Sequence, residues 1–265
     1  MSEISLDFLA KVEAIAKNVG AFQLLHWNHV KAESIEDKGL NQLVSFVDQQ
    51  SEQMLVDQLG EMLPSSTFIG EEKAPNNRVL TEYTWIIDPL DGTTNFLHGL
   101  PVFSISIALM NHNEPILGVV YCPALKESFI ALKNKGAFLN GQRIEVAKNA
   151  NLNDTLIATG FPYYQFEKVN EYLQVLSTFM RKTHGLRRMG SAAIDLAYTA
   201  CGRFDAFFEM NLSPWDIAAG IVLVQEAGGI CTDFSGNGDI IFKNEIVASS
   251  DRLYPNFVKE LSILI

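Results

Sequence analysis

Short β-like runs crowd the middle of the chain, and this feature limits the possible fold more than any other. Between residues 85 and 132, short apolar runs of strand length follow one another with little chain between them. Asn140-Gly141, just beyond them, is a dipeptide typical of a tight hairpin. The middle of the chain is therefore expected to be mostly sheet, with strands at 85–87, 103–110, 116–121 and 128–132.

Helical patterns frame this sheet on both sides. Apolar residues recur every three or four positions over residues 5–27 and 48–62, and Asp48 or Ser51 is a candidate cap for the second helix. Blocks of helices and strands in this order predict an α+β or layered α/β/α architecture, in one compact domain covering residues 1–265. Further helices are expected at 167–181, 192–201, 216–227 and 255–264, and further strands at 155–160, 205–210 and 246–248.

Charge and composition exclude several classes of function. The formal net charge of -11 over 265 residues disfavours nucleic acid as a main partner, because phosphate backbones need a basic surface. No apolar stretch approaches the roughly 18 residues of a membrane span, and residues 1–11 carry acids rather than a signal peptide. The three cysteines form no C-x-x-C pair. A cytoplasmic protein that acts on small molecules is expected.

The segment most informative about chemistry is residues 85–96, WIIDPLDGTTNF. An apolar strand leads directly into Asp88, and Pro89 is expected to end its hydrogen-bonding ladder because proline has no N–H to donate. Asp91 follows three residues later. Residues 92–94 supply a glycine, which allows close backbone approach to a ligand, and then a helix start that can bind an anion. The segment predicts cation and phosphate sites side by side.

Two more acids complete a candidate metal site. Glu71 leaves a second predicted strand after residues 68–70, and Asp216 follows Trp215 at a predicted helix start. Each motif alone is typical of a turn, a solvated loop or a helix cap. If they converge with the two aspartates of the first segment, they form an all-oxygen site without His or Cys, which suits Mg²⁺ or Mn²⁺ better than Zn²⁺.

Together these motifs resemble the inositol monophosphatase family. Residues 88–96 (DPLDGTTNF), with His98 and Pro101, look like its first signature, and residues 215–220 (WDIAAG) with 226–229 (EAGG) look like its second. Residues 68–72 resemble its glutamate-bearing loop, and 187–198 resemble the bacterial branch. The likeness runs from about Lys11 to Lys259 and implies a layered α/β/α/β/α sandwich, a homodimer and inhibition by lithium.

The resemblance implies a role for each of these positions. Each subunit would bind two Mg²⁺ ions through Glu71, Asp88, the Leu90 carbonyl, Asp91 and Asp216. A third ion would be held more weakly near Glu71. The expected catalytic residues are Glu71, Thr93 and Asp91, with Glu71 and Thr93 positioning the attacking water. The phosphorylated polyol would contact Gly92, Thr93, Gly190, Ser191, Ala192, Glu209 and Asp216.

The expected activity is Mg²⁺-dependent hydrolysis of a small polyol phosphate, above all myo-inositol 1-phosphate. Two alternatives stay open: a related nucleotide bisphosphate or fructose 1,6-bisphosphate phosphatase, and a regulatory binding role of the same fold. Residues 94–96 (TNF) favour the polyol phosphate phosphatase over the nucleotidase branch of the family. Asn41 departs from the family by replacing an aspartate near Lys38, which affects the neighbourhood of the third metal.

Overall fold

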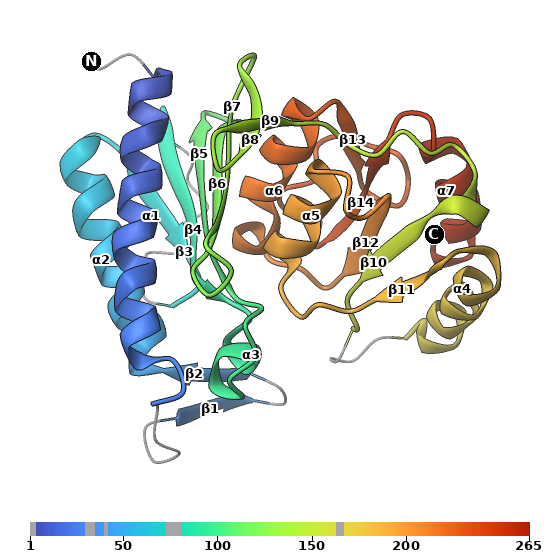
Figure 1. Cartoon of the computed structure of the whole chain (residues 1–265), viewed down its shortest axis with the longest axis horizontal. Coiled ribbons are helices and arrows are strands. Elements are labelled where there is room, and N and C mark those ends of the chain that lie inside the picture. Colours follow the sequence, from blue (N-terminus) through green and yellow to red (C-terminus); the bar gives the residue numbers. More distant parts are fainter. Residues whose placement is uncertain (1–3, 30–34, 40–41, 73–80, 163–166) are drawn as a thin grey trace.

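Two β-sheets and three layers of helices build the described part of the chain (Figure 1). The structure is a computed structural model, and it describes residues 4–29, 35–39, 42–72, 81–162 and 167–265. The region around Asn41 and the side chain of Lys38 lie outside the described parts.

The helices are α1 (Leu6–His26), α2 (Phe46–Met62), α3 (Thr93–Leu97), α4 (Val169–Lys182), α5 (Ala192–Ala200), α6 (Pro214–Glu226) and α7 (Tyr254–Leu261). In spatial order, the first sheet holds β3 (Thr67–Gly70), β4 (Tyr83–Asp91), β5 (Ser104–Asn111), β6 (Glu114–Cys122), β7 (Glu127–Leu132), β8 (Gly136–Leu139) and β9 (Gln142–Ile144). The second sheet holds β11 (Gly185–Arg187), β10 (Leu156–Thr159), β12 (Ala206–Met210), β14 (Glu245–Ser250) and β13 (Gly229–Thr232). A separate antiparallel pair joins β1 (Ile35–Gly39) to β2 (Gln42–Ser45).

The helices cover both faces of each sheet. Helices α1 and α2 lie on the outer face of the first sheet, α5 and α6 lie between the sheets, and α4 and α7 cover the far face of the second sheet (Figure 1). Each layer has an apolar cluster, illustrated by Trp85 against α1 and α2, Leu196 between the sheets, and Phe257 on the buried face of α7. The predicted α/β/α/β/α sandwich is confirmed.

Strand β5 shows how its sequence pattern produces two buried faces. Ile105 and Ile107 pack toward α1 and α2, as the alternation predicts. Ser104 and Ser106 point to the opposite face and are buried as well. Ser104 lies 3.3 Å from the Ser191 hydroxyl before α5, and the Ser106 hydroxyl donates to the Trp215 carbonyl of α6 at 3.1 Å. These serines therefore connect β5 to both middle helices.

Most predicted elements are confirmed, with differences at their ends. The Asn140-Gly141 hairpin is present between β8 and β9, and both residues have positive φ, 48° and 79°. Helix α2 begins earlier than predicted, because Ser45 caps it and Asp48 bonds back to the Ser45 N–H at 2.9 Å. The prediction of Asp48 or Ser51 as the cap is thus wrong. None of the helices in the described ranges is both long and apolar enough to cross a membrane.

Candidate active site

The end of β4 brings two aspartates into one irregular turn. Regular pairing with β5 is interrupted at Pro89, as predicted, but the strand does not end there: β4 continues to Asp91, which pairs with Ser104 after a register shift between Asp88 and Asp91. The shift leaves residues 89 and 90 without paired partners on β5. The Leu90 N–H instead donates to Asp88 Oδ1 at 2.9 Å, so the turn is fixed by its own side chain. Both aspartates are buried.

A glycine and a short helix follow directly. Gly92 has a φ of 92°, in the left-handed region, and a Cβ there would lie 2.9 Å from the Val102 carbonyl oxygen. Only glycine fits both the conformation and the space. The predicted helix start at Thr93 is confirmed by α3, which places backbone N–H groups at the cavity beside the carboxylates.

Helix α5 holds the second of these aspartates. The Ser191 hydroxyl donates to Asp91 Oδ2 at 2.6 Å, and the Ala193 N–H donates to the same oxygen at 2.8 Å. Ser191 also caps α5 by accepting from the Ile194 N–H at 3.2 Å. Ser191 lines the cavity, but its hydroxyl is bonded to Asp91 in this structure, which fixes the carboxylate against the helix start.

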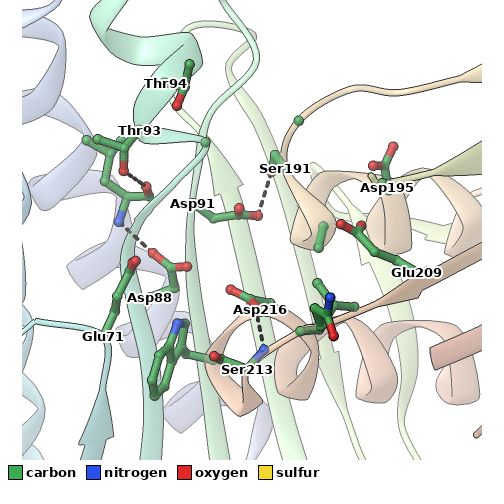
Figure 2. Close-up of a pocket in the computed structure, with 18 of the residues that line it drawn as sticks. Glu71, Asp88, Asp91, Thr93, Thr94, Ser191, Asp195, Glu209, Ser213 and Asp216 are labelled. Carbon is green, nitrogen blue, oxygen red and sulfur yellow. Dashed lines mark hydrogen bonds between the residues drawn. The ribbon is translucent and has the colours of Figure 1, made fainter. Parts of the chain in front are cut away.

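The other two predicted acids reach the same cavity from different elements. Strand β3 pairs in parallel with β4, opposing Gly70 to Ile87, so Glu71 leaves the sheet beside Asp88. Asp216 lies in the first turn of α6 and accepts from the Ser213 N–H at 2.6 Å. Helix α6 begins at Pro214, two residues before the predicted start. Figure 2 shows the carboxylates of these residues directed toward one opening.

One cavity of about 530 Å³ gathers every residue predicted to bind metal or substrate. These are Glu71, Asp88, Leu90, Asp91, Gly92, Thr93, Gly190, Ser191, Ala192, Glu209 and Asp216. The same cavity is also lined by Thr94, which belongs to the predicted anion-binding helix start, and by Arg188. Further lining residues, which the sequence does not identify as site residues, are Gly160, Asp195, Asn211, Leu212, Ser213 and Trp215.

Burial and crowding make these carboxyls reluctant to ionise. Burial raises the pKa of Asp88 well above its usual value, and the nearby charges of Glu71, Asp91 and Asp216 raise it further. Burial raises the pKa of Asp91 to about 6, although hydrogen bonds from α5 oppose the shift. Burial also raises the pKa of Asp216 well above its usual value, and Asp91 adds to the effect. A bound cation would reverse these shifts.

The donor set fits a hard divalent cation. The predicted ligands supply only oxygen atoms, and no His or Cys is among the described residues that line the cavity. As placed in the described part of the chain, no three His, Cys, Asp or Glu side chains form a group that could already hold an ion. An ion would have to draw the carboxylates inward, which their repulsion opposes until the ion is present.

Asp48 contacts the site through Thr93, although its sequence position indicates only a helix cap. The Thr93 hydroxyl lies 2.9 Å from both Asp48 Oδ1 and the Leu90 carbonyl oxygen, and it has one proton to donate between them. Asp48 is buried, which raises its pKa. Its sequence signal, an acid three residues after Ser45, identifies only the cap. The contact to Thr93 spans 45 residues and has no local pattern.

The far end of the cavity is shaped around Glu209 on β12. A Cβ at Gly160 would lie 1.7 Å from Glu209 Oε1, so the missing side chain leaves room for this carboxyl. Burial raises the pKa of Glu209 to about 8. Asn95 of α3 donates to the Val102 carbonyl at 2.7 Å and to the Met189 carbonyl at 2.9 Å, which ties α3 to the chain before α5.

Known proteins match this chain over nearly its whole length. A model of the inositol monophosphatase family matches residues 6–265. The putative Nus factor SuhB of Neisseria meningitidis serogroup B is 42% identical over 255 residues, which cover 96% of this chain and 98% of that protein. The fructose-1,6-bisphosphatase/inositol-1-monophosphatase of Thermotoga maritima is 38% identical and covers 96% of this chain and 94% of its own. The crystal structure of the extragenic suppressor protein suhB from Bartonella henselae aligns with a TM-score of 0.89 at 37% identity, covering 96% of this chain and 98% of its own. The chain therefore belongs to the inositol monophosphatase family.

Proposed function

We propose that the protein is a Mg²⁺-dependent phosphatase that hydrolyses the phosphate monoester of a small polyol, with myo-inositol 1-phosphate as the preferred substrate. The observation that carries this proposal is the meeting of Glu71, Asp88, Asp91 and Asp216 in one cavity, beside the start of α3. A cluster of acids alone would repel a phosphate, and a helix start alone would bind one without activating it. Their juxtaposition supports hydrolysis.

The metal ligands in this proposal are the residues whose charges crowd the cavity. One Mg²⁺ would be held by Glu71, Asp88 and the Leu90 carbonyl, a second by Asp88, Asp91 and Asp216, and a third, weaker one near Glu71. Bound Mg²⁺ activates water for attack and neutralises charge on the leaving oxygen.

The protein's own groups orient the attack. The Thr93 hydroxyl has Asp48 as a proton acceptor at 2.9 Å, so it can donate to Asp48 while accepting a proton from a water molecule. Glu71 would share the positioning of that water. The backbone N–H groups of Gly92 and Thr93 would donate to the phosphate oxygens at the start of α3.

The polyol would lie toward Glu209 and residues 190–192. The cavity has the size common for small-molecule sites, and its far end holds a carboxyl that can accept hydrogen bonds from hydroxyl groups. Asp216, whose carboxylate also faces the opening in Figure 2, would contact both metal and substrate.

Two alternatives have specific support. The Thermotoga maritima relative is named for both fructose-1,6-bisphosphatase and inositol-1-monophosphatase, and Arg188 lines the cavity here, where it could attract a second phosphate. The relatives named as Nus factors support a regulatory binding role, which the same chain could combine with catalysis.

A substrate panel separates these possibilities. Phosphate release would be measured with Mg²⁺ and with a chelator, from inositol 1-phosphate, glycerol 2-phosphate, fructose 1,6-bisphosphate and adenosine 3′,5′-bisphosphate. We expect Mg²⁺-dependent release, fastest from inositol 1-phosphate. Preference for a bisphosphate would identify the protein as a fructose 1,6-bisphosphate or nucleotide bisphosphate phosphatase. Absence of release from every substrate under every divalent metal would contradict the enzyme proposal and favour the binding role.

The resemblance supports three further properties of the same protein: a homodimer, inhibition by lithium and a cytoplasmic location. Light scattering of the purified protein tests the first, and we expect twice the monomer mass. Lithium titration of Mg²⁺-dependent phosphate release tests the second, and we expect progressive inhibition. Fractionation of the source cells tests the third.

A further inference from the structure

A glutamine is buried in the apolar face of α1. Gln23 is 0% exposed, on the helix that also contributes Val12 and Val19 to the outer apolar cluster. A buried amide is costly unless it forms hydrogen bonds, so its contacts indicate why a polar side chain is present here.

Gln23 reaches the metal-binding turn. Its Nε2 lies 2.6 Å from the Pro89 carbonyl oxygen and 3.2 Å from the Ser51 hydroxyl of α2. Pro89 is within the register shift between Asp88 and Asp91, so its carbonyl has no partner in the β4–β5 ladder. Gln23 supplies the donor that the sheet does not.

This contact fixes one particular peptide plane. The Pro89 carbonyl and the Leu90 N–H belong to the same planar peptide unit. The carbonyl end accepts from Gln23, and the N–H end donates to Asp88 Oδ1 at 2.9 Å. The unit is therefore held at both ends, and rotating it would break both bonds, releasing Asp88 from its present orientation.

The orientation of the Gln23 amide is also determined. Exchanging its nitrogen and oxygen would place Oε1 against the Pro89 carbonyl oxygen, which is repulsive. As placed, Oε1 is buried and has no hydrogen-bond partner among the described residues. The fold thus tolerates one unsatisfied atom in order to donate to this carbonyl.

We infer that Gln23 is a positioning residue for the metal site: it holds the Pro89–Leu90 peptide, and through it Asp88 and the Leu90 carbonyl, in the geometry that binds Mg²⁺. This inference rests on the proposed function, since it assumes that Asp88 and Leu90 are ligands. Groups that orient metal ligands typically change metal affinity by roughly 10–100-fold when they are lost.

The test is calorimetric titration of the full-length protein with Mg²⁺ alone, without substrate. Gln23→Met keeps the size of the side chain and removes the donor, and Gln23→Leu removes the donor with a shorter apolar side chain. We expect both variants to bind Mg²⁺ roughly tenfold more weakly than the wild type. The leucine variant provides the test if the methionine variant aggregates.

Two control variants separate positioning from stability. Gln58→Met removes a glutamine that donates to the Met54 carbonyl within its own helix, at 3.0 Å, and it should leave Mg²⁺ affinity unchanged. Val19→Ala creates a cavity in the same face of α1, so it should lower the melting temperature without changing Mg²⁺ affinity. Wild-type Mg²⁺ affinity in a folded Gln23 variant would overturn the inference and leave the proposed function standing. A wild-type protein that binds no Mg²⁺ would overturn both.

Discussion

More carboxyl side chains gather around the cavity than ordinary folding would favour. Six carboxyl side chains line it: Glu71, Asp88, Asp91, Asp195, Glu209 and Asp216. Arg188 is the only cationic side chain among the described residues of the lining. Asp195 Oδ1 is buried and has no hydrogen-bond partner among the described residues. Buried carboxyl groups without partners lower the stability of the folded protein. They are typical of functional sites, where a bound ligand supplies a cation or a hydrogen-bond donor.

Thr93 is the residue whose hydroxyl should matter most for the rate. Thr93→Val keeps the shape of the side chain but removes the proton path to Asp48, so we expect kcat to fall by about a hundredfold or more. Thr93→Ser keeps the hydroxyl and should retain most of kcat. Steady-state phosphate release measures both variants. Thr178→Val, on the exposed face of α4, is the matched control, and equal kcat for the two valine variants would contradict the role of Thr93.

At the scale of helices and strands, the site lies where several elements begin or end together. The carboxyl ends of β3 and β4 bring in Glu71 and Asp88, while the first turns of α5 and α6 hold Asp91 and supply Asp216. Strand ends and helix starts leave backbone groups outside the regular ladders. Here the side chains that satisfy those groups are also the proposed ligands, as with Asp216 and the Ser213 N–H.

Local sequence patterns predict the elements and the acids better than the contacts between them. An apolar run ending in an aspartate identifies β4, and helical spacing identifies α1 and α2, because these signals lie within one element. The bonds from Gln23 to Pro89 and from Thr93 to Asp48 join residues 66 and 45 positions apart, so no local pattern contains them. The sequence does not identify β11 and β13, which have three and four residues.

The end of α6 contributes to stability without touching the cavity. Glu226 accepts hydrogen bonds from the N–H groups of residues 134, 135 and 136, in the turn between β7 and β8, at 2.8, 3.1 and 2.7 Å. We expect Glu226→Ala to lower the free energy of unfolding by about 1–3 kcal/mol, because it leaves these donors without their acceptor. Glu226→Gln, which keeps one oxygen, should lose less. Denaturant unfolding measures both, and kcat should stay at the wild-type value; wild-type stability of the alanine variant would contradict the expectation.

On the scale of the whole molecule, the cavity joins the two halves of the sandwich. Asp88, Asp91 and α3 belong to the first sheet and its connections, whereas Glu209 lies on β12 of the second sheet (Figure 1). Helices α5 and α6 lie between the sheets and contribute residues to the same cavity. A cation bound there would join residues of the first sheet to Asp216 of α6, so metal binding and global stability should be coupled.

The stability of the metal-free protein should depend on pH. The pKa of Asp91 is raised to about 6 and that of Glu209 to about 8, mainly by burial. Because their unfolded pKa values are about 4, the unfolded chain releases protons that the folded protein retains as the pH rises from about 4 to 8. The free energy of unfolding of the metal-free protein should therefore fall over this range.

Mg²⁺ should restore the lost stability, and more so at the higher pH, because it binds the ionised carboxylates. Urea unfolding at pH 5 and pH 8, each with a chelator and with saturating Mg²⁺, measures the four values. Stability of the metal-free protein that rises from pH 5 to pH 8, or a Mg²⁺ effect that is larger at pH 5, would contradict this expectation.

The most direct measurement is the rate of phosphate release from inositol 1-phosphate by the wild type and Asp216→Asn, with saturating Mg²⁺ and with a chelator. Asp57→Asn, on the exposed face of α2, is the matched control. If the carboxylates bind catalytic Mg²⁺, the wild type and Asp57→Asn will require the metal, and Asp216→Asn will be slower by about a hundredfold or more at the same Mg²⁺ concentration. Release that persists in the chelator, or that survives at the wild-type rate in Asp216→Asn, would contradict a metal-dependent phosphatase at this site.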